Sequence, residues 1–346
     1  MSRVASVVTA LLAAATAFAG CVAPPEDVAP ESQAPGAVGA VGASYVPPTG
    51  KGAVGYLAGY TMTHPNRIAS SPDTMAKARA DLVAELQGFG LEVVEHKYSD
   101  TGTNILAIQN GTTTPDEWIV LSAHYDTAKT TLYGAWDDGA GVAMLLELAR
   151  AGATRSHNHT IVYAFFDEEE SGLLGSKAFV EEYQALVTFA ANLNFDPPGL
   201  NWPCADAQGP LPVKVIFNDE KVGKDLPGYA ALRDAVLAGL DAAQVPEDVR
   251  DFSPGIPVAT LNGEGLRGTS DHKSFDDVDV PNVFIGSAPT SAAGPVAGMT
   301  YLLHTPIDTQ QQMEVRCGGA DLLEQAFQVE ITVVVEALSI LDAHAA

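Results

Sequence analysis

The chain has 346 residues, of which 47% are hydrophobic, so it is long enough to bury a full core as one large domain. Its 18 Lys and Arg residues are outnumbered by 43 Asp and Glu residues, and the formal net charge is −25. Binding to a nucleic-acid backbone depends on clustered Lys and Arg, and the sequence contains no such cluster. We therefore expect no nucleic-acid partner.

The first 20 residues have the composition of an export signal. They carry one positive charge, Arg3, followed by an apolar run that is too short to span a membrane. The stretch that ends in Cys21 resembles a bacterial lipobox, in which the cysteine is acylated, although Phe18 stands where Leu is usual. A small-x-small pattern at 17–19 supports ordinary signal cleavage instead. We expect an exported protein that is either lipid-anchored to the bacterial cell envelope through Cys21 or secreted.

Residues 21–50 are rich in Ala, Pro and Gly and show no apolar periodicity, which is typical of a flexible tether. The folded domain is expected to occupy residues 51–346, because no linker or internal repeat divides that part of the sequence. We expect the domain to contact a membrane only through a lipid anchor at the N-terminus. We also expect it to be a monomer.

Helical and extended patterns alternate along this domain. A helix is expected at 74–87, where Asp73 caps its start and glycines stop it. Short apolar runs predict strands at 118–121, 161–166, 191–195, 213–217 and 283–285. Further helical patterns occur at 141–150, 176–186, 229–243 and 322–341. Apolar strands separated by helices indicate an α/β fold, a single globular domain whose mostly parallel, twisted sheet is flanked by helices on both faces.

Acidic residues and histidines gather in five short stretches at the ends of apolar runs. These are SAHYD at 122–126, WDD at 136–138, DEEESG at 167–172, NFD at 194–196 and HTPID at 304–308. Three of the stretches follow predicted strands directly, and the carboxyl ends of parallel strands meet at one edge of a sheet. The sequence therefore predicts one crevice lined by imidazoles and carboxylates.

The number of imidazoles and carboxylates in these stretches predicts a metal site. A single His-x-Asp, as at 124–126, is weak evidence, and an Asp before a helix, as at 137–138, can simply cap that helix. Four consecutive acids at 167–170 repel one another unless a cation or solvent relieves them. The combination supplies enough ligands for a pair of divalent ions and leaves one carboxylate as a base, which is the equipment of metal-assisted hydrolysis.

The stretch EESGLLGS at 169–176, together with DDGAG at 137–141, resembles the M28 family of zinc metallopeptidases, whose members include secreted bacterial aminopeptidases. The resemblance covers about residues 54–340 and implies the zinc-aminopeptidase fold. It also implies two Zn²⁺ ions as cofactors. By this resemblance His124 and Asp196 hold one ion, Glu170 and His304 hold the other, and Asp137 bridges the two.

The resemblance assigns catalytic roles as well. Glu169 takes the position of the general base, which activates a water that bridges the two metal ions, and Asp126 orients His124. Asp271 and His272 belong to a TSDH stretch that lies near the rim of the site in the family. These two residues are therefore candidates for a supporting or substrate-contacting position.

Several family aminopeptidases have a Tyr directly before the last histidine ligand, where this chain has Leu303. Tyr301 and Tyr125 are alternative sources of a hydroxyl for the oxyanion, whose stabilisation otherwise rests on the metals. The histidines at 157, 159 and 344 lack a ligand context and are expected to face solvent.

The two remaining cysteines, Cys204 and Cys317, would lie in an oxidising compartment if the chain is exported, and they would then be able to pair. Two unpaired, buried thiols are an equally open alternative.

The favoured function is that of an exported aminopeptidase that hydrolyses N-terminal residues from peptides. The main alternative is a glutaminyl-peptide cyclotransferase, a relative of the same fold that uses a single zinc ion, because the stretches at 123–126, 145–150 and 165–167 resemble the cyclase. Against it, cyclases usually have Ser after the metal-binding Asp, where this chain has Asp138. A carboxypeptidase needs a cation for the free carboxylate, and Lys129, Arg267 and Lys273 are candidates for it. A non-catalytic binding module of the same fold is the remaining alternative.

Overall fold

The computed structural model describes residues 45–206, 209–217, 228–252, 270–287 and 302–343. The predicted signal segment, Cys21 and most of the predicted tether lie outside these residues, as do Arg267, Tyr301 and His344. The chain is already buried at Pro48 and Gly50, within the last residues of the predicted tether. Among the residues described, no helix combines the length and the apolar character needed to cross a bilayer.

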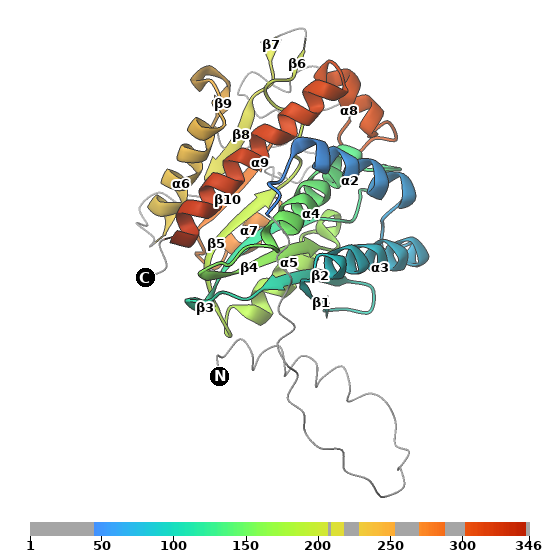
Figure 1. The fold of residues 1–346 in the computed structure, drawn as a ribbon. Helices are drawn as coiled ribbons and strands as arrows, with labels where there is room; N and C mark the ends of the chain where they lie inside the picture. Colours follow the sequence, from blue (N-terminus) through green and yellow to red (C-terminus); the bar gives the residue numbers. More distant parts are fainter. Residues whose placement is uncertain (1–44, 207–208, 218–227, 253–269, 288–301, 344–346) are drawn as a thin grey trace, which may run out of the picture.

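An eight-stranded sheet forms the centre of the structure, with the strand order β1-β2-β4-β3-β5-β10-β8-β9 (Figure 1). In chain order the strands are β1 Glu92–Lys97, β2 Thr103–Gln109, β3 Thr114–His124, β4 His159–Phe166, β5 Thr188–Phe195, β8 Val213–Phe217, β9 Arg250–Asp251 and β10 Asn282–Gly286. A separate pair is formed by β6 Ala205–Asp206 and β7 Gly209–Pro210. The central strands β4, β3, β5 and β10 run parallel, and antiparallel pairs lie on either side of them. The prediction of a mostly parallel sheet is therefore confirmed.

Helices cover both faces of this sheet (Figure 1). One face packs against α2 Gly50–Thr63, α3 Pro72–Gly88, α4 Ala140–Gly152, α6 Tyr229–Ala242 and α9 Ala320–Ala343, and the other against α5 Leu174–Tyr183 and α7 His272–Asp276. Along β3, Ile119 and Leu121 join the larger core cluster while Trp118 and Val120 join the smaller one. Successive side chains of a strand point to opposite faces, so coverage of both faces explains why β4 is buried along its whole length.

The predicted strands and helices are all present, but several elements were not predicted. These are α2, β1, β2, α7, α8 Gln310–Cys317 and the short strands. Helix α2 has a weak local signal because its sequence, GKGAVGYLAGYTMT, is rich in glycine, which disfavours helix. The Thr49 side chain caps it by accepting the N–H of Gly52, and contacts with α4 and α9 supply the remaining stabilisation.

Two expectations outside the predicted crevice are settled by the fold. Cys204 and Cys317 form a disulfide, with their Cα atoms 4.4 Å apart, so pairing is the alternative observed. The expectation that His157 and His159 face solvent was wrong, since both are buried with Nδ1 within 3.4 Å of the carboxylate of Asp342 in α9. Because this carboxylate comes from a helix far along the chain, the local sequence gave no sign of it.

Candidate metal centre

The ligand-bearing stretches converge at the carboxyl edge of the sheet. His124 ends β3, Asp196 follows β5, and the acidic turn at 167–170 follows β4. These strands are neighbours in the sheet and parallel, so their ends lie side by side. Asp137 and His304 reach the same place from outside the sheet, from the turn Ala135–Gly139 before α4 and from the segment before α8.

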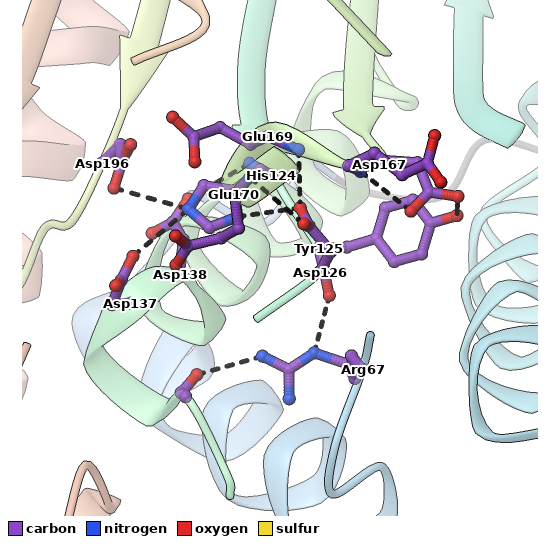
Figure 2. A network of polar contacts seen from close by, with 12 residues as sticks. Arg67, His124, Tyr125, Asp126, Asp137, Asp138, Asp167, Glu169, Glu170 and Asp196 are labelled. Atoms are coloured by element: carbon purple, nitrogen blue, oxygen red, sulfur yellow. Dashed lines mark hydrogen bonds and ion pairs between the residues drawn. The ribbon is translucent and has the colours of Figure 1, made fainter. Parts of the chain in front are cut away.

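The five predicted ligands form two groups that share Asp137. The Nε2 atom of His124 lies 3.2 Å from Oδ1 of Asp137 and 3.6 Å from Oδ1 of Asp196 (Figure 2). The Nε2 atom of His304 lies 3.1 Å from the other carboxylate oxygen of Asp137 and 3.2 Å from Oε1 of Glu170. Within each group the ligand atoms all lie within 4.8 Å of one another. The structure thus brings together every residue that the sequence analysis named as a ligand.

This donor set fits zinc. Each group combines one imidazole nitrogen with carboxylate oxygens, which are ligands that zinc takes in proteins. Oδ2 of Asp137 and Oε1 of Glu170 are buried, and neither forms a hydrogen bond of good geometry with Nε2 of His304, which lies 3.1 and 3.2 Å away, or with any other described residue. A buried carboxylate oxygen without a well-formed hydrogen bond is costly, and a cation held by Asp137, Glu170 and His304 would satisfy both oxygens.

The pKa values of the candidate ligands also favour a cation at this site. Close contacts with the carboxylates of Asp137 and Glu170 raise the pKa of His304 to about 11. Burial opposes a charge on His124, but the carboxylate of Asp196 and further hydrogen bonds raise its pKa well above the ordinary value. Burial and the charge of Asp137 raise the pKa of Glu170 to about 7. Crowded carboxylates therefore hold protons on the imidazoles, and a divalent cation supplies the same positive charge in their place.

Glu169 lies close to one candidate ligand of each group, but it is not a member of either of the two groups that share Asp137. Its carboxylate is within 4.8 Å of ligand atoms of His124 and Glu170, and Figure 2 shows it extending on the side of Asp196. Burial raises the pKa of Glu169 well above its ordinary value, and the charges of Asp196 and Asp271 add to this rise while His124 opposes it. A partly exposed carboxylate whose pKa is raised is a stronger base than an ordinary carboxylate, which suits it to accept a proton.

Asp126 supports both sides of the centre. Its Oδ1 lies 3.2 Å from Nδ1 of His124, the contact that was expected from the sequence. The same carboxylate also accepts the backbone N–H groups of Glu169 at 3.0 Å and Glu170 at 3.2 Å (Figure 2). One buried side chain therefore orients an imidazole ligand and holds the turn that carries the base.

The two adjacent aspartates at 137 and 138 have different roles. Oδ1 of Asp138 accepts the N–H of Gly141 at 2.9 Å in the first turn of α4, and Oδ2 accepts the N–H of His124 at 3.3 Å. Asp138 is thus the aspartate that caps the helix, and Asp137 is the one that faces the histidines.

Arg67 is a residue of the site that the sequence analysis missed. It is fully buried and lies beside the segment of Tyr125 (Figure 2). Its guanidinium donates to four backbone carbonyls. These belong to Tyr125 at 2.6 Å, Tyr133 at 2.7 Å, His64 at 3.1 Å and Gly134 at 3.1 Å. Arg67 therefore ties the segment after β3 to the loop that leads to Asp137. No local pattern marks it, because its partners are carbonyl groups.

Two of the predicted supporting residues lie at the start of α7. Asp271 is completely buried, and its carboxylate oxygens form no hydrogen bond of good geometry among the described residues, although the Ser176 hydroxyl interacts with them. Its charge contributes to the raised pKa of Glu169, so it lies close to the base. His272 is also buried, and its ring packs edge-on against Phe284 with centroids 5.5 Å apart. Asp271 thus lies in a supporting position, whereas His272 packs into the core against Phe284.

Two other candidate side chains are engaged elsewhere. The hydroxyl of Tyr125 donates to the carbonyl of Thr103 at 2.6 Å and to Asp167 at 2.8 Å, so it is not directed at the ligands. Lys273 forms ion pairs with Asp276 and Asp277 on its own helix.

Known proteins that are similar in sequence include peptidases described as zinc-dependent, which is consistent with a metal site. Residues 104–219 match the peptidase family M28. A "Probable zinc metalloprotease" of Pyrenophora tritici-repentis is 38% identical over 105 residues, which cover 28% of this chain and 24% of that protein. "Aminopeptidase NAALADL1" of Mus musculus is 33% identical over 130 residues, or 35% of this chain and 17% of that protein. The chain thus spans about a quarter or less of the length of these curated relatives.

Solved structures share the fold. The LapA aminopeptidase of Legionella pneumophila has a TM-score of 0.64 at 21% identity, covering 85% of this chain and 72% of that one. The glutaminyl cyclase of Porphyromonas gingivalis has a TM-score of 0.57 at 21% identity, covering 84% of this chain and 98% of that one. The fold is therefore common to aminopeptidases and cyclases, and the activity has to be argued from the residues of the site.

Proposed function

Because residues 104–219 match peptidase family M28, we propose that this chain is a two-zinc aminopeptidase that releases N-terminal residues from peptides. The observation that carries the proposal is the shared carboxylate. Asp137 turns one oxygen toward His124 and the other toward His304, and each histidine has a further carboxylate beside it. Two complete donor groups suit two ions, whereas a cyclotransferase needs one.

When bound, the zinc ions supply Lewis acidity, which polarises the scissile carbonyl and lowers the pKa of water. The residues of the chain position the reactants and move the proton. Glu169 is placed to take a proton from the attacking water and pass it to the leaving amine. The 3.0 Å hydrogen bond from its backbone N–H to Asp126 holds it beside His124 while it does so.

Carboxylates around the centre favour a substrate with a free amino group. Glu169, Asp196 and Asp271 concentrate negative charge at this edge of the sheet, which attracts an α-ammonium and repels an α-carboxylate. A carboxypeptidase needs the opposite charge, and Lys273 is occupied by ion pairs on α7. We therefore favour an aminopeptidase over a carboxypeptidase.

A substrate screen tests the activity. Zinc-loaded protein is assayed with aminoacyl-4-nitroanilides and dipeptides, and separately with Gln-peptides for the release of ammonia. We expect free amino acids to be released by protein that holds two zinc ions per chain. Ammonia release from Gln-peptides by protein that holds one zinc ion supports the cyclotransferase and rejects the aminopeptidase.

The Glu169→Gln variant tests the mechanism. We expect kcat to fall by about 10²- to 10⁴-fold, because a carboxamide cannot accept the proton, while two zinc ions remain bound. Glu181→Gln, at an exposed position of α5, removes the same charge and should keep the parent rate. A Glu169→Gln variant that hydrolyses substrate at the parent rate removes Glu169 from the mechanism.

Export of the enzyme is also part of the proposal. It rests on the composition of residues 1–20 and on the Cys204–Cys317 disulfide, a bond typical of oxidising compartments. Mass spectrometry of the mature protein distinguishes a Cys21 that is acylated from ordinary signal cleavage. A mature protein that retains residues 1–20 contradicts both.

A further inference from the structure

Asp308 lies in the HTPID stretch, where the proposed function gives it no role. It is fully buried, and its two carboxylate oxygens accept consecutive backbone N–H groups, from Trp136 at 2.7 Å and from Asp137 at 3.1 Å. Its own carbonyl oxygen lies 3.5 Å from the backbone nitrogen of Ala135, which donates to it. One residue of the segment that carries His304 therefore holds the backbone of the turn that carries Asp137.

Trp136 fastens the other side of the same turn. Its indole N–H donates to the hydroxyl of Ser287 at 3.0 Å, and that hydroxyl donates to the carbonyl of Pro197 at 2.7 Å. The backbone N–H of Ser287 donates to the same carbonyl at 2.9 Å. Pro197 directly follows Asp196, so the turn is anchored to the ligand segment after β5 as well. Asp137 therefore lies between two anchors, each connected to the segment of another ligand.

We propose that Asp308, with Trp136 as a second arm, is a positioning residue that keeps Asp137 in reach of both histidines and so allows two metal ions to bind together. The inference rests on the proposed two-zinc site. The physical basis of the proposal is the number of hydrogen-bond acceptors that the side chain offers to the backbone of the turn. A carboxylate accepts both backbone N–H groups, whereas an amide at the same place offers one acceptor and sets an NH₂ group against the other N–H. The turn must then move, and one oxygen of Asp137 moves with it.

The chain contains a control for the loss of a carboxylate charge beside backbone N–H groups. Oδ1 of Asp342 accepts the backbone N–H groups of both Asn158 and His159, each at 2.8 Å, and Oδ2 lies 3.3 Å from Nδ1 of His157. These residues lie at the start of β4, and the metal centre lies beyond its other end. Asp342→Asn therefore removes the same charge without touching the turn that carries Asp137, and its single amide oxygen can still accept both N–H groups.

The experiment compares metal binding by the parent, Asp308→Asn and Asp342→Asn. Metal-free proteins are titrated with Zn²⁺ and with Co²⁺, bound metal is counted by elemental analysis, and the visible Co²⁺ spectrum is recorded. We expect Asp342→Asn to bind two ions with the parent spectrum. Asp308→Asn should keep one ion and bind the other about 10- to 100-fold more weakly, with a changed spectrum for the second equivalent of Co²⁺. Thermal melting of the metal-free proteins measures the cost of each substitution to the fold separately from its effect on metal binding.

Trp136→Phe is the second variant, in case Asp308→Asn does not fold. It removes the indole hydrogen bond to Ser287 together with part of a fully buried ring, and we expect it to weaken binding of the second ion relative to Asp342→Asn. Binding of two ions by Asp308→Asn or Trp136→Phe with the affinity and spectrum of the parent overturns the inference. A parent that binds one ion overturns the two-zinc function instead. In that case the affinity of Asp308→Asn for the single ion is compared with that of Asp342→Asn. Equal affinities reject the positioning role of Asp308.

Discussion

Buried carboxylates in this chain differ in the number of backbone N–H groups that they accept. The carboxylates of Asp126 and Asp308 each accept two backbone N–H groups beside the metal centre. Glu330, in α9, accepts one N–H, from Gly199 at 2.8 Å, and its other oxygen has no hydrogen-bond partner among the described residues. Burial raises the pKa of Glu330 to about 8, and the hydrogen bond from Gly199 opposes this rise. We therefore expect Glu330 to be mostly protonated at neutral pH in the folded protein.

Glu330 makes the stability depend on pH. Its ordinary pKa is 4.5, so the folded state binds this proton more tightly than the unfolded state does. The stability that protonated Glu330 contributes is complete below pH 4.5 and is lost as the pH rises through about 8. In Glu330→Gln this loss should disappear, so the variant should gain on the parent by on the order of a few kcal/mol between about pH 5 and 9. Urea unfolding across this range measures the difference.

Glu336→Gln is the control for this measurement, because Glu336 lies on the same helix and is partly exposed. Its difference from the parent should stay constant with pH. A constant difference for Glu330→Gln as well would show that Glu330 does not titrate in this range.

At the scale of elements, the disulfide joins the regions of the chain that follow two of the candidate ligands, Asp196 and His304. Cys204 follows the segment of Asp196, and Cys317 ends α8, the helix that follows the segment of His304. Both cysteines are completely buried. The bond therefore links the two regions that meet at the turn of Asp137, in parallel with the hydrogen bonds of Trp136 and Asp308.

Removal of the disulfide should destabilise the whole domain. It joins residues separated by 113 positions, so it restricts a long loop of the unfolded chain. We expect the double variant Cys204→Ala, Cys317→Ala to lose about 2–5 kcal/mol of stability in urea unfolding. The parent should fall to a similar value in a reductant, whereas the double variant should not respond to it. Equal stability of the oxidised parent and the double variant would argue that the bond contributes nothing.

At the scale of the molecule, the net charge of −25 and the crowded carboxylates of the metal centre oppose compact folding. Metal ions that bind the folded chain and not the unfolded one relieve the local repulsion and shift the unfolding equilibrium. The stabilisation follows mass action and reaches about 4 kcal/mol when free metal is a thousandfold above Kd. Metal binding and global stability should therefore change together.

Chelation tests this link. We expect the protein to melt at a lower temperature after treatment with a chelator, and two equivalents of Zn²⁺ to restore the melting temperature after the chelator is removed. Mg²⁺ at the same ionic strength is the control and should restore little, because it prefers octahedral oxygen ligands over imidazole. The same Tm with and without zinc would contradict a metal centre that contributes to folding.

The sequence was sufficient to predict the central strands and the acidic and histidine residues that meet at their ends, because both leave a local pattern. An apolar run such as 161–166 followed at once by acids indicates a buried strand with a polar end, and parallel strand ends must meet. The family resemblance then distinguished Asp137 from Asp138, two neighbours that differ in nothing but their place. The structure supplies the reason for that distinction, since Asp138 caps α4 and Asp137 faces the histidines.

The residues that hold the centre in shape became visible only after folding. Arg67 binds carbonyls of loops more than fifty positions away, Asp308 binds the turn before α4, and Asp342 gathers two histidines that were expected in solvent. Helix α2 and the β1–β2 pair also became visible only after folding, because α2 packs against α4 and α9 and β2 pairs with β4, which come later in the chain. A local pattern records which side chains are apolar and where a strand ends. Which backbone groups a buried charge will satisfy depends on how distant segments pack.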